Sequence, residues 1–202
     1  MADDRRVRAY VGLGANVGDA LATLEAAVAA LGSLPGTHLR GVSRLYATRP
    51  VGLEDQADFL NAVVALDVPA GPDPETGAHA LLLALKRLER AFGRQARGRW
   101  GPRELDLDLL VFGRHRVHGE RPAAGQSLDP GREGRQWLDV PHASAAERLF
   151  VLAPLADLAP GLVPPGWRTT VAGRRDARLA AEGPGAARPV GVWQADRRAW
   201  VL

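Results

Sequence analysis

The chain has 202 residues, no cysteine, and a net charge of +3 from 26 basic and 23 acidic side chains. Its length fits one large domain, or one domain followed by a tail. The lack of an 18-residue apolar run excludes a classical membrane-spanning helix. The lack of cysteine excludes a disulfide scaffold, a thiolate zinc site and a cysteine nucleophile, and it favours a cytoplasmic location.

The basic side chains are almost all arginine, since Lys86 is the only lysine. The base composition of the genome would explain this bias. Anion binding would explain it as well, because guanidinium groups bind phosphate in a bidentate manner. The total charge does not separate these two explanations, whereas the position of the arginines along the chain can.

The first half of the chain predicts the order strand, helix, strand, strand, helix. These elements are strands at 7–13, 38–47 and 59–68, helices at 20–31 and 75–92, and a loop at 48–57. In the first helix, Leu21, Leu24, Val28 and Leu31 recur at the spacing of one helix face. Asp19 precedes them as a candidate N-cap.

The second half predicts shorter elements and more irregular segments. They are a strand at 105–112, an exposed loop or hairpin tip at 119–136, an extended segment at 138–141 and a helix at 147–158. Residues 173–189 are rich in Gly, Ala, Arg and Pro, which is typical of a linker. Residues 190–202 are expected either to pair as a small hairpin through Trp193 and Trp200 or to remain an appendage.

The order of the elements favours one fold class. Two strands lie between the two long helices, so they can pair antiparallel. This favours an α+β fold, a ferredoxin-like antiparallel sheet with helices packed on it, over a doubly wound parallel sheet. We expect this domain at residues 1–165, followed by an extension at 166–202.

Asp106 and Asp108 lie two residues apart on a predicted strand. Side chains alternate along a strand, so both carboxylates point to one face. Two carboxylates that point together repel each other unless a cation lies between them, and Mg²⁺ suits such an all-oxygen site. The alternative is a polar strand face that is simply exposed to water.

Positive charge is concentrated just before this strand. Residues 86–103 hold seven basic side chains against one acid, Glu89, which gives +6. A nucleotide triphosphate site needs arginines for the phosphate oxygens and carboxylates for the bridging metal. Several glycines place these arginines on a loop that could close over a substrate, with Trp100 either covering the ligand or anchoring the loop. The alternative is a solvated helix face followed by an arginine-rich loop.

Two further clusters contain groups that suit a ligand. Phe59 can stack on a flat heterocycle, while Asn61, near Thr48 in the predicted fold, offers paired donor and acceptor groups. His142 and Arg148 could contact a phosphate or a ribose. For each cluster alone, a structural role is the better explanation.

Other nucleotide-binding patterns are absent or weak. No Walker A sequence occurs, and Lys86 has no glycine just before it. Gly12, Gly14 and Gly18 only loosely resemble a dinucleotide fingerprint, so a nicotinamide-dependent enzyme is a weak alternative. A nucleic-acid-binding module is a second alternative, but the chain is only 5% aromatic and lacks the expected sheet-face aromatic pattern.

The segment Arg99–Leu110, RWGPRELDLDLL, resembles the signature of the 6-hydroxymethyl-7,8-dihydropterin pyrophosphokinase family of folate biosynthesis. Segments 10–16, 50–61 and 140–150 are also similar to that family, and the resemblance covers about residues 7–165. It implies an ATP-binding transferase, a kinase that moves the terminal diphosphate of ATP to the pterin hydroxymethyl oxygen and releases AMP.

The resemblance also implies roles for individual residues. Two Mg²⁺ ions are held by Asp106 and Asp108. The residues around the triphosphate and the loop are Arg94, Arg97, Arg99, Trp100 and Arg103. The residues around the pterin are Thr48, Phe59, Asn61 and Phe150. The residues near ATP are Glu89, His142 and Arg148.

Five features depart from the family pattern. The loop between Gly93 and Arg99 is one residue shorter, which leaves open the phosphate that Arg97 contacts, and the tail after about residue 166 has no family counterpart. Phe59 stands where tyrosine is common, and Trp137 where an arginine often precedes the Val-Pro-His segment. Segment 119–136 has no family counterpart. The partners that the resemblance implies are ATP and the pterin, and we expect a monomer that binds neither membranes nor nucleic acid.

Overall fold

The computed structural model describes residues 5–50, 55–95, 101–127, 129 and 134–202. Within these residues the strands are β1 Arg6–Ala15, β2 His38–Val42, β3 Leu45–Thr48, β4 Phe59–Pro69, β5 Asp106–Phe112, β6 Val117–Glu120, β7 Trp137–Val140, β8 Arg188–Gln194 and β9 Ala199–Val201. The α-helices are α1 Ala20–Gly32, α2 Pro74–Ala91, α3 Leu149–Leu158 and α4 Val171–Glu182. Short 3₁₀ turns lie at Ala123–Gly125 and Ala145–Glu147.

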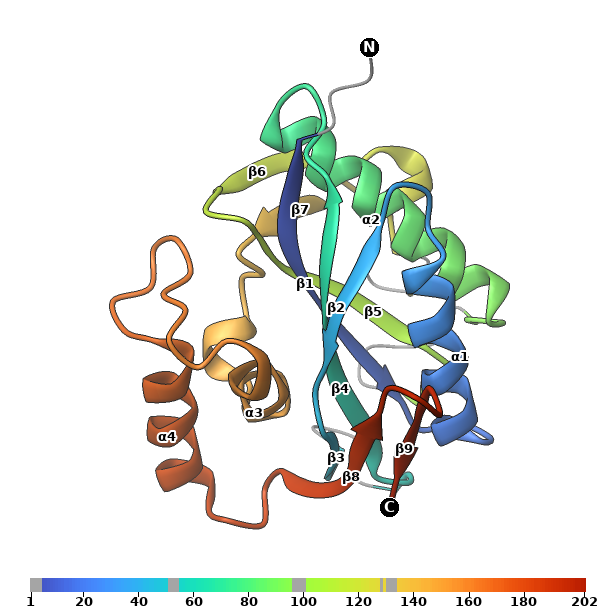
Figure 1. Cartoon of the computed structure of the whole chain (residues 1–202), viewed down its shortest axis with the longest axis vertical. Helices are drawn as coiled ribbons and strands as arrows, with labels where there is room; N and C mark the ends of the chain where they lie inside the picture. The colour runs from blue at the N-terminus through green and yellow to red at the C-terminus, as the bar shows by residue number, and fades with distance from the viewer. Residues whose placement is uncertain (1–4, 51–54, 96–100, 128, 130–133) are drawn as a thin grey trace.

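Seven of the described strands form one antiparallel sheet in the order β5-β1-β4-β3-β8-β9, with β2 paired to another part of β4. Helices α1 and α2 lie on one face of this sheet, and α3 and α4 lie on the other (Figure 1). Strands β6 and β7 form a separate two-stranded hairpin. The predicted ferredoxin-like class, an antiparallel sheet with helices packed on it, is confirmed.

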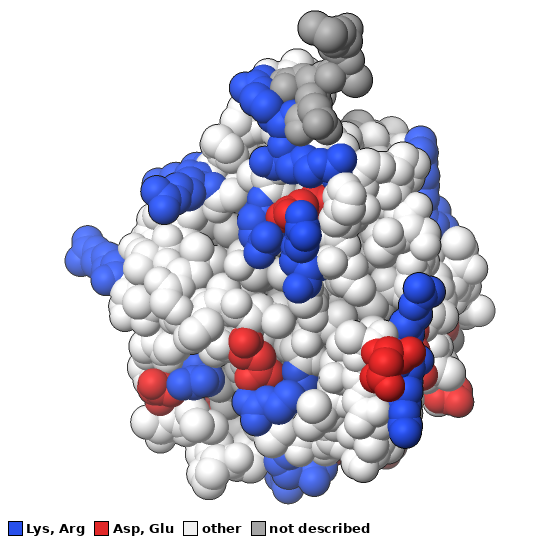
Figure 2. Space-filling model, viewed as in Figure 1, with Lys and Arg blue, Asp and Glu red and all other residues white. Residues whose placement is uncertain are grey.

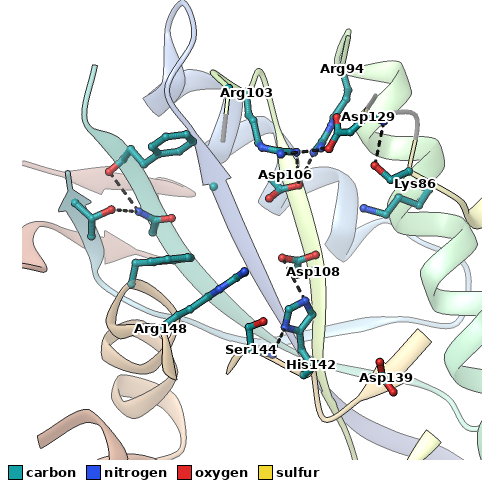
Figure 3. A pocket seen from close by; sticks show the side chains of 18 of the residues that line it. Lys86, Arg94, Arg103, Asp106, Asp108, Asp129, Asp139, His142, Ser144 and Arg148 are labelled. Carbon is teal, nitrogen blue, oxygen red and sulfur yellow. Dashed lines mark hydrogen bonds and ion pairs between the residues drawn. The ribbon is translucent and has the colours of Figure 1, made fainter. Parts of the chain in front are cut away.

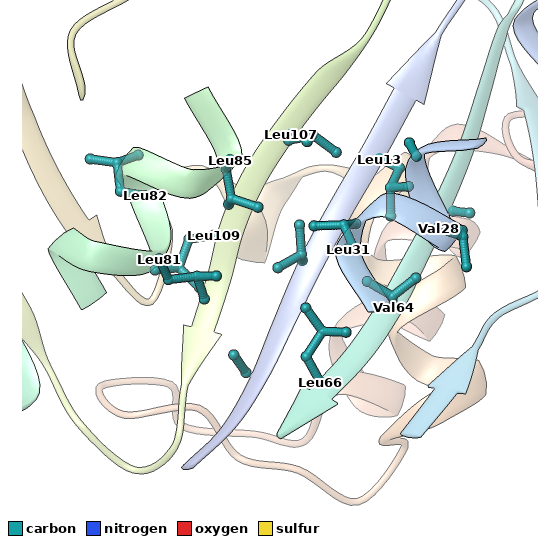
Figure 4. Packing of buried hydrophobic residues seen from close by; sticks show 14 of the residues in the cluster. Leu13, Val28, Leu31, Val64, Leu66, Leu81, Leu82, Leu85, Leu107 and Leu109 are labelled. Carbon is teal, nitrogen blue, oxygen red and sulfur yellow. The ribbon is translucent and has the colours of Figure 1, made fainter. Parts of the chain in front are cut away.

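The alternating side chains of the central strands divide the core into two layers. Val11, Leu13, Val64 and Leu66 point towards α1 and α2, and Figure 4 shows the leucine-rich packing of this layer. On the opposite face, Val63 and its neighbours pack against α3. Apolar burial of this extent is the main source of stability for a domain of this size.

The predicted strand at 38–47 is interrupted at residues 43 and 44. There the Ser43 hydroxyl accepts a bond from the Val63 N–H at 2.9 Å, and Arg44 turns outward to pair with Asp157. Two shorter strands, β2 and β3, replace the single predicted one. The break allows the chain to pair with two different parts of β4.

The linker predicted at 173–189 is wrong, because most of it is helix α4. Thr170 caps this helix by accepting the Gly173 N–H, and Val171 is buried against the α3 layer. Alanine and arginine are both strong helix formers, so a composition that resembles a linker also favours a helix. Besides Val171, Leu179 also packs, partly buried, against a small core cluster.

The C-terminal hairpin is part of the main sheet, since β8 pairs with β3. Strands β8 and β9 pair as a hairpin, one of the two alternatives that the sequence leaves open, and Trp193 and Trp200 meet edge to face with ring centroids 4.8 Å apart. The Trp200 backbone N–H donates to the Glu25 carboxylate, and its indole N–H donates to the Ser43 carbonyl, each at 2.9 Å. These contacts attach the hairpin to α1 and to the β2–β3 break.

Several surface arginines pair with acidic side chains, and the face seen in Figure 2 shows basic groups with acidic neighbours. Asp67 on β4 lies between Arg8 and Arg40, at 2.6 Å from each guanidinium. Hydrogen bonding to Arg8 holds the pKa of Asp67 below its ordinary value. Among the described residues, no helix is long and apolar enough to cross a membrane.

We predict that Trp200→Ala lowers the free energy of unfolding by about 3 kcal/mol, because it leaves a cavity and removes the indole bond to Ser43. Urea denaturation of wild type and variant measures this loss. Leu202→Ala is the control, since Leu202 is 76% exposed, and we expect little change. Equal stability of Trp200→Ala and wild type would show that the hairpin is an appendage.

Candidate active site

A pocket with a volume of about 350 Å³ lies over the end of the sheet (Figure 3). It collects the predicted site residues from five separate segments of the chain. The predicted residues that line it are Thr48, Phe59, Asn61, Arg94, Arg103, Asp106, Asp108, His142, Arg148 and Phe150. Glu89 is buried beside Arg94, while Arg97, Arg99 and Trp100 lie outside the described residues.

The pocket lies where the α3 face of the sheet changes from apolar to polar. Along β5 the residues on this face are Leu110, then Asp108, then Asp106; along β4 they are Val63, then Asn61. The apolar members pack under α3, and the polar members lie beyond the end of that cluster. One continuous face therefore supplies both part of the core and the floor of the site.

Gly14 lies between the two polar ends of this floor. In register, it is opposite Asn61 on β4 and opposite Asp106 on β5, so the three residues form one row across the sheet. A Cβ atom at position 14 would lie 3.2 Å from the Asn61 side-chain oxygen. The absence of a side chain at Gly14 keeps the floor of the pocket open between the amide and the carboxylate.

One end of the pocket offers hydrogen-bonding groups beside aromatic rings. Asn61 is buried, and its amide N–H₂ donates to the Thr48 hydroxyl at 2.8 Å and to the Phe59 carbonyl at 3.3 Å. These bonds fix the orientation of the amide group. The Phe59 and Phe150 rings line the same end, and the Arg148 guanidinium lies 5.7 Å from the centre of the Phe150 ring. This end suits a flat polar heterocycle.

The other end contains the two aspartates, and both are half-buried. Asp106 contacts Arg94 and Arg103, and Asp108 lies 4.0 Å from His142 Nε2. The Ser144 N–H donates to His142 Nδ1, so the neutral imidazole carries its proton on Nε2, the atom that faces Asp108. The expected placement of both carboxylates on one strand face is confirmed.

Glu89 attaches helix α2 to strand β5 at the back of the site. Its carboxylate accepts the Leu107 N–H and a Lys86 ammonium N–H, each at 2.7 Å. Burial raises the pKa of the Glu89 carboxyl, while the positive charges of Lys86 and Arg94 oppose that shift. Because the Leu107 side chain is buried in the core layer beneath α1 and α2, its neighbours Asp106 and Asp108 point to the opposite face, into the pocket.

Arg94 and Arg103 lie side by side at the edge of this end (Figure 3). Burial opposes the charge of Arg94, but the carboxylates of Asp106 and Glu89 outweigh it and raise the pKa of Arg94. The backbone of Arg103 is held by Asn16, whose N–H donates to the Arg103 carbonyl and whose side-chain oxygen accepts the Arg103 N–H. Both guanidinium groups are thus fixed before any ligand binds.

Sequence reasoning missed several residues of the pocket. Asn16 fixes Arg103 and also donates from its amide to Gln56, a link that only the folded chain creates. Asp129 was placed in an exposed loop, yet it is 7% exposed and contacts both Arg94 and Arg103. The other lining residues without a predicted role include Arg49, Lys86, Arg121, Trp137, Asp139 and Ser144. Asp129 lies in a Gly- and Pro-rich segment without a periodic pattern of apolar residues, so the sequence gives no signal of its burial.

The donor atoms of the pocket fit a hard divalent cation. Asp106 and Asp108 offer carboxylate oxygens from the same strand face, and such oxygens are the ligands that Mg²⁺ prefers. No cluster of three or more potential metal ligands occurs in the part of the chain that the structure describes. A cation here would therefore complete its coordination with oxygens from substrate and water.

Comparison with known proteins identifies the family. The family model "7,8-dihydro-6-hydroxymethylpterin-pyrophosphokinase (HPPK)" matches residues 10–160. The 2-amino-4-hydroxy-6-hydroxymethyldihydropteridine pyrophosphokinase of Pseudomonas aeruginosa is 43% identical over 80% of this chain and 86% of its own. The protein of the same name from Methylorubrum extorquens is 41% identical over 77% of this chain and 85% of its own.

The solved structures agree in fold. A Plasmodium falciparum HPPK-DHPS with pteroate matches 98% of this chain with a TM-score of 0.69 and 15% sequence identity. This chain spans about half of that longer one, 48%. From the family match and the close relatives together, the chain belongs to the 7,8-dihydro-6-hydroxymethylpterin-pyrophosphokinase family and is a diphosphokinase.

Proposed function

We propose that this pocket performs the reaction of the family, the transfer of diphosphate from ATP to the hydroxymethyl group of 6-hydroxymethyl-7,8-dihydropterin in folate biosynthesis. The main support for assigning the reaction to this pocket is the row Asn61–Gly14–Asp106. This row joins a heterocycle-binding end to a carboxylate–arginine end, and Gly14 places no side chain between them. An acceptor bound at one end therefore has direct access to phosphates bound at the other.

The pterin is assigned to the end that contains Asn61 and Thr48. The bonds to Thr48 and to the Phe59 carbonyl use both N–H groups and fix the amide, so its side-chain oxygen can accept from the edge of a flat ring. Phe59 and Phe150 supply apolar surface for the two ring faces. Phe59 lacks the hydroxyl of a tyrosine but keeps this stacking surface.

The triphosphate is assigned to the opposite end. Arg94 and Arg103 are preorganised there, and His142 and Arg148 line the space between the two ends. Glu89 acts through Arg94 and the β5 backbone rather than on ATP itself. For Arg97, Arg99 and Trp100, which lie outside the described residues, a phosphate-binding and covering role rests on the family resemblance.

Asp106 and Asp108 would hold magnesium, and we propose two ions as the resemblance implies. When bound, Mg²⁺ neutralises the phosphate charge and orients the transferred group. The arginines add positive charge around the phosphate oxygens.

The reaction needs alignment more than covalent help from the protein. The hydroxymethyl oxygen forms a bond to the β-phosphorus, the bond from that phosphorus to AMP breaks, and the hydroxyl proton is released. An in-line displacement of this kind needs both substrates held in register and its charge neutralised. We therefore assign no strong general base to the pocket.

We further propose that one copy of the chain is the working unit and that it acts in the cytoplasm. The absence of cysteine is compatible with a reducing compartment. The proposed site lies within residues 1–165, and the extension 166–202 adds β8 beside β3, the strand that carries Thr48.

Asp106→Asn and Asp108→Asn should each lower kcat at least about 100-fold, because each removes a charge that would hold the metal. AMP release from ATP, Mg²⁺ and the pterin measures this. Asp139→Asn is the control, since it removes a carboxylate from the same pocket but from β7. Undiminished turnover in the Asp106 and Asp108 variants would contradict the assignment.

Asn61→Ala should raise the KM for the pterin by about tenfold or more and leave the KM for ATP nearly unchanged, because Asn61 lies at the end of the pocket assigned to the pterin, away from the arginines assigned to the triphosphate. Steady-state kinetics with each substrate varied in turn separates the two constants. Equal increases in both KM values would place Asn61 outside the pterin site.

A further inference from the structure

Asp129 reaches the phosphate end of the pocket from the segment that joins β6 to β7. It is 7% exposed, and its Oδ2 lies 3.3 Å from Arg94 Nη2 and 3.2 Å from Arg103 Nη2. The Asp129 N–H donates to the Ser127 hydroxyl at 3.2 Å. The carboxylate therefore bridges the two guanidinium groups from within the pocket wall.

With Asp106, this bridge makes a closed arrangement of four charges. Each arginine contacts both Asp106 and Asp129, so cations and anions alternate around the group (Figure 3). The Arg94 side chain is 11% exposed and the Arg103 side chain 17%. Guanidinium groups so poorly hydrated need anionic partners, and here the protein supplies both.

The same two guanidinium groups are those that we assign to the triphosphate. A phosphate oxygen and the Asp129 carboxylate would compete for the same N–H donors, and their negative charges repel each other. Asp106 faces a similar competition, but a metal bound there would favour its carboxylate form and remain beside the phosphates. No such role is available to Asp129 through its present contacts with the two arginines.

We propose that Asp129 sets the affinity for ATP by occupying the anion position between Arg94 and Arg103 until a phosphate group replaces it. This inference rests on the proposed function, because it requires these arginines to receive phosphate. Binding then exchanges one anion for another, and the arginines stay compensated throughout. The cost of displacing Asp129 lowers the apparent affinity for the nucleotide.

The alternative is that Asp129 strengthens phosphate binding. If Asp129 only positions the arginines, its charge aligns them for the phosphates, and its loss weakens phosphate binding. The two roles predict changes of opposite sign in the affinity for a simple polyphosphate. Inorganic triphosphate is the suitable probe, because it has no base or ribose to bind elsewhere.

The experiment compares wild type with Asp129→Asn, which keeps the shape of the side chain and removes its charge. We expect calorimetry to show that inorganic triphosphate binds Asp129→Asn about tenfold more tightly than wild type. Asp139→Asn removes the same charge from the same pocket, but its partner is His118, at 2.7 Å. We expect a much smaller change there, which separates local competition from the general charge of the pocket.

Stability provides a second measurement. Without ligand, Asp129→Asn should unfold at a lower temperature than wild type, and triphosphate should raise its melting temperature more than it raises that of wild type. Asp67→Asn is the matched control, because Asp67 also lies between two arginines but far from the pocket lining. It should show no added response to triphosphate.

The outcomes distinguish a failure of the phosphate assignment from a failure of the competition proposed for Asp129. If Arg103→Ala leaves triphosphate binding unchanged, the phosphate assignment itself is wrong, and the inference falls with it. If Arg103→Ala weakens binding while Asp129→Asn binds triphosphate no more tightly than wild type, the assignment stands and the competition is refuted. An equal increase in triphosphate affinity in Asp139→Asn would also refute the competition.

Discussion

One buried carboxylate connects the architecture to the chemistry of this chain. Glu89, near the end of α2, accepts the backbone N–H of Leu107 and at the same time contacts Lys86 and Arg94. The first contact holds the outer edge of β5 against the helix, where the Leu107 side chain is buried in the core layer and Asp106 and Asp108 lie on the opposite face. The last contact places Arg94 against that strand. Breaking a buried ionic group of this kind is strongly destabilising, because the remaining charges lose their partners.

The core and the floor of the site share one face of the sheet. The α3 face of β4 and β5 is apolar where α3 covers it and polar beyond, so the packing that stabilises the domain also determines the floor of the pocket. Gly14 on β1 leaves the space between the two polar ends of the pocket open. Before any ligand binds, the positive and negative groups at the phosphate end already compensate one another. On our proposal, a triphosphate exchanges partners within this group of charges rather than filling an empty positive cavity.

Local patterns predicted the parts of this arrangement that depend on near neighbours in sequence. The alternation around Leu107 predicted two aspartates on one face, and the spacing of apolar residues predicted α1. The family and its diphosphate transfer, inferred from the same residues, are confirmed, whereas the roles of individual site residues remain predictions. Long-range contacts were not predictable. The pairing of β8 with β3, the links of Asn16 to Arg103 and the burial of Asp129 depend on segments that meet only in the folded chain. Helix α4 was missed for a different reason, because its alanines and arginines resemble a linker by composition.

The most direct test is a crystal structure of the chain with a nonhydrolysable ATP analogue, the pterin and Mn²⁺ in place of Mg²⁺. The account predicts anomalous scattering from manganese at Asp106 and Asp108, phosphate oxygens on Arg94 and Arg103, and the pterin ring between Phe59 and Phe150. Manganese bound away from these aspartates, or a triphosphate that leaves Arg94 and Arg103 paired with Asp129, would contradict it.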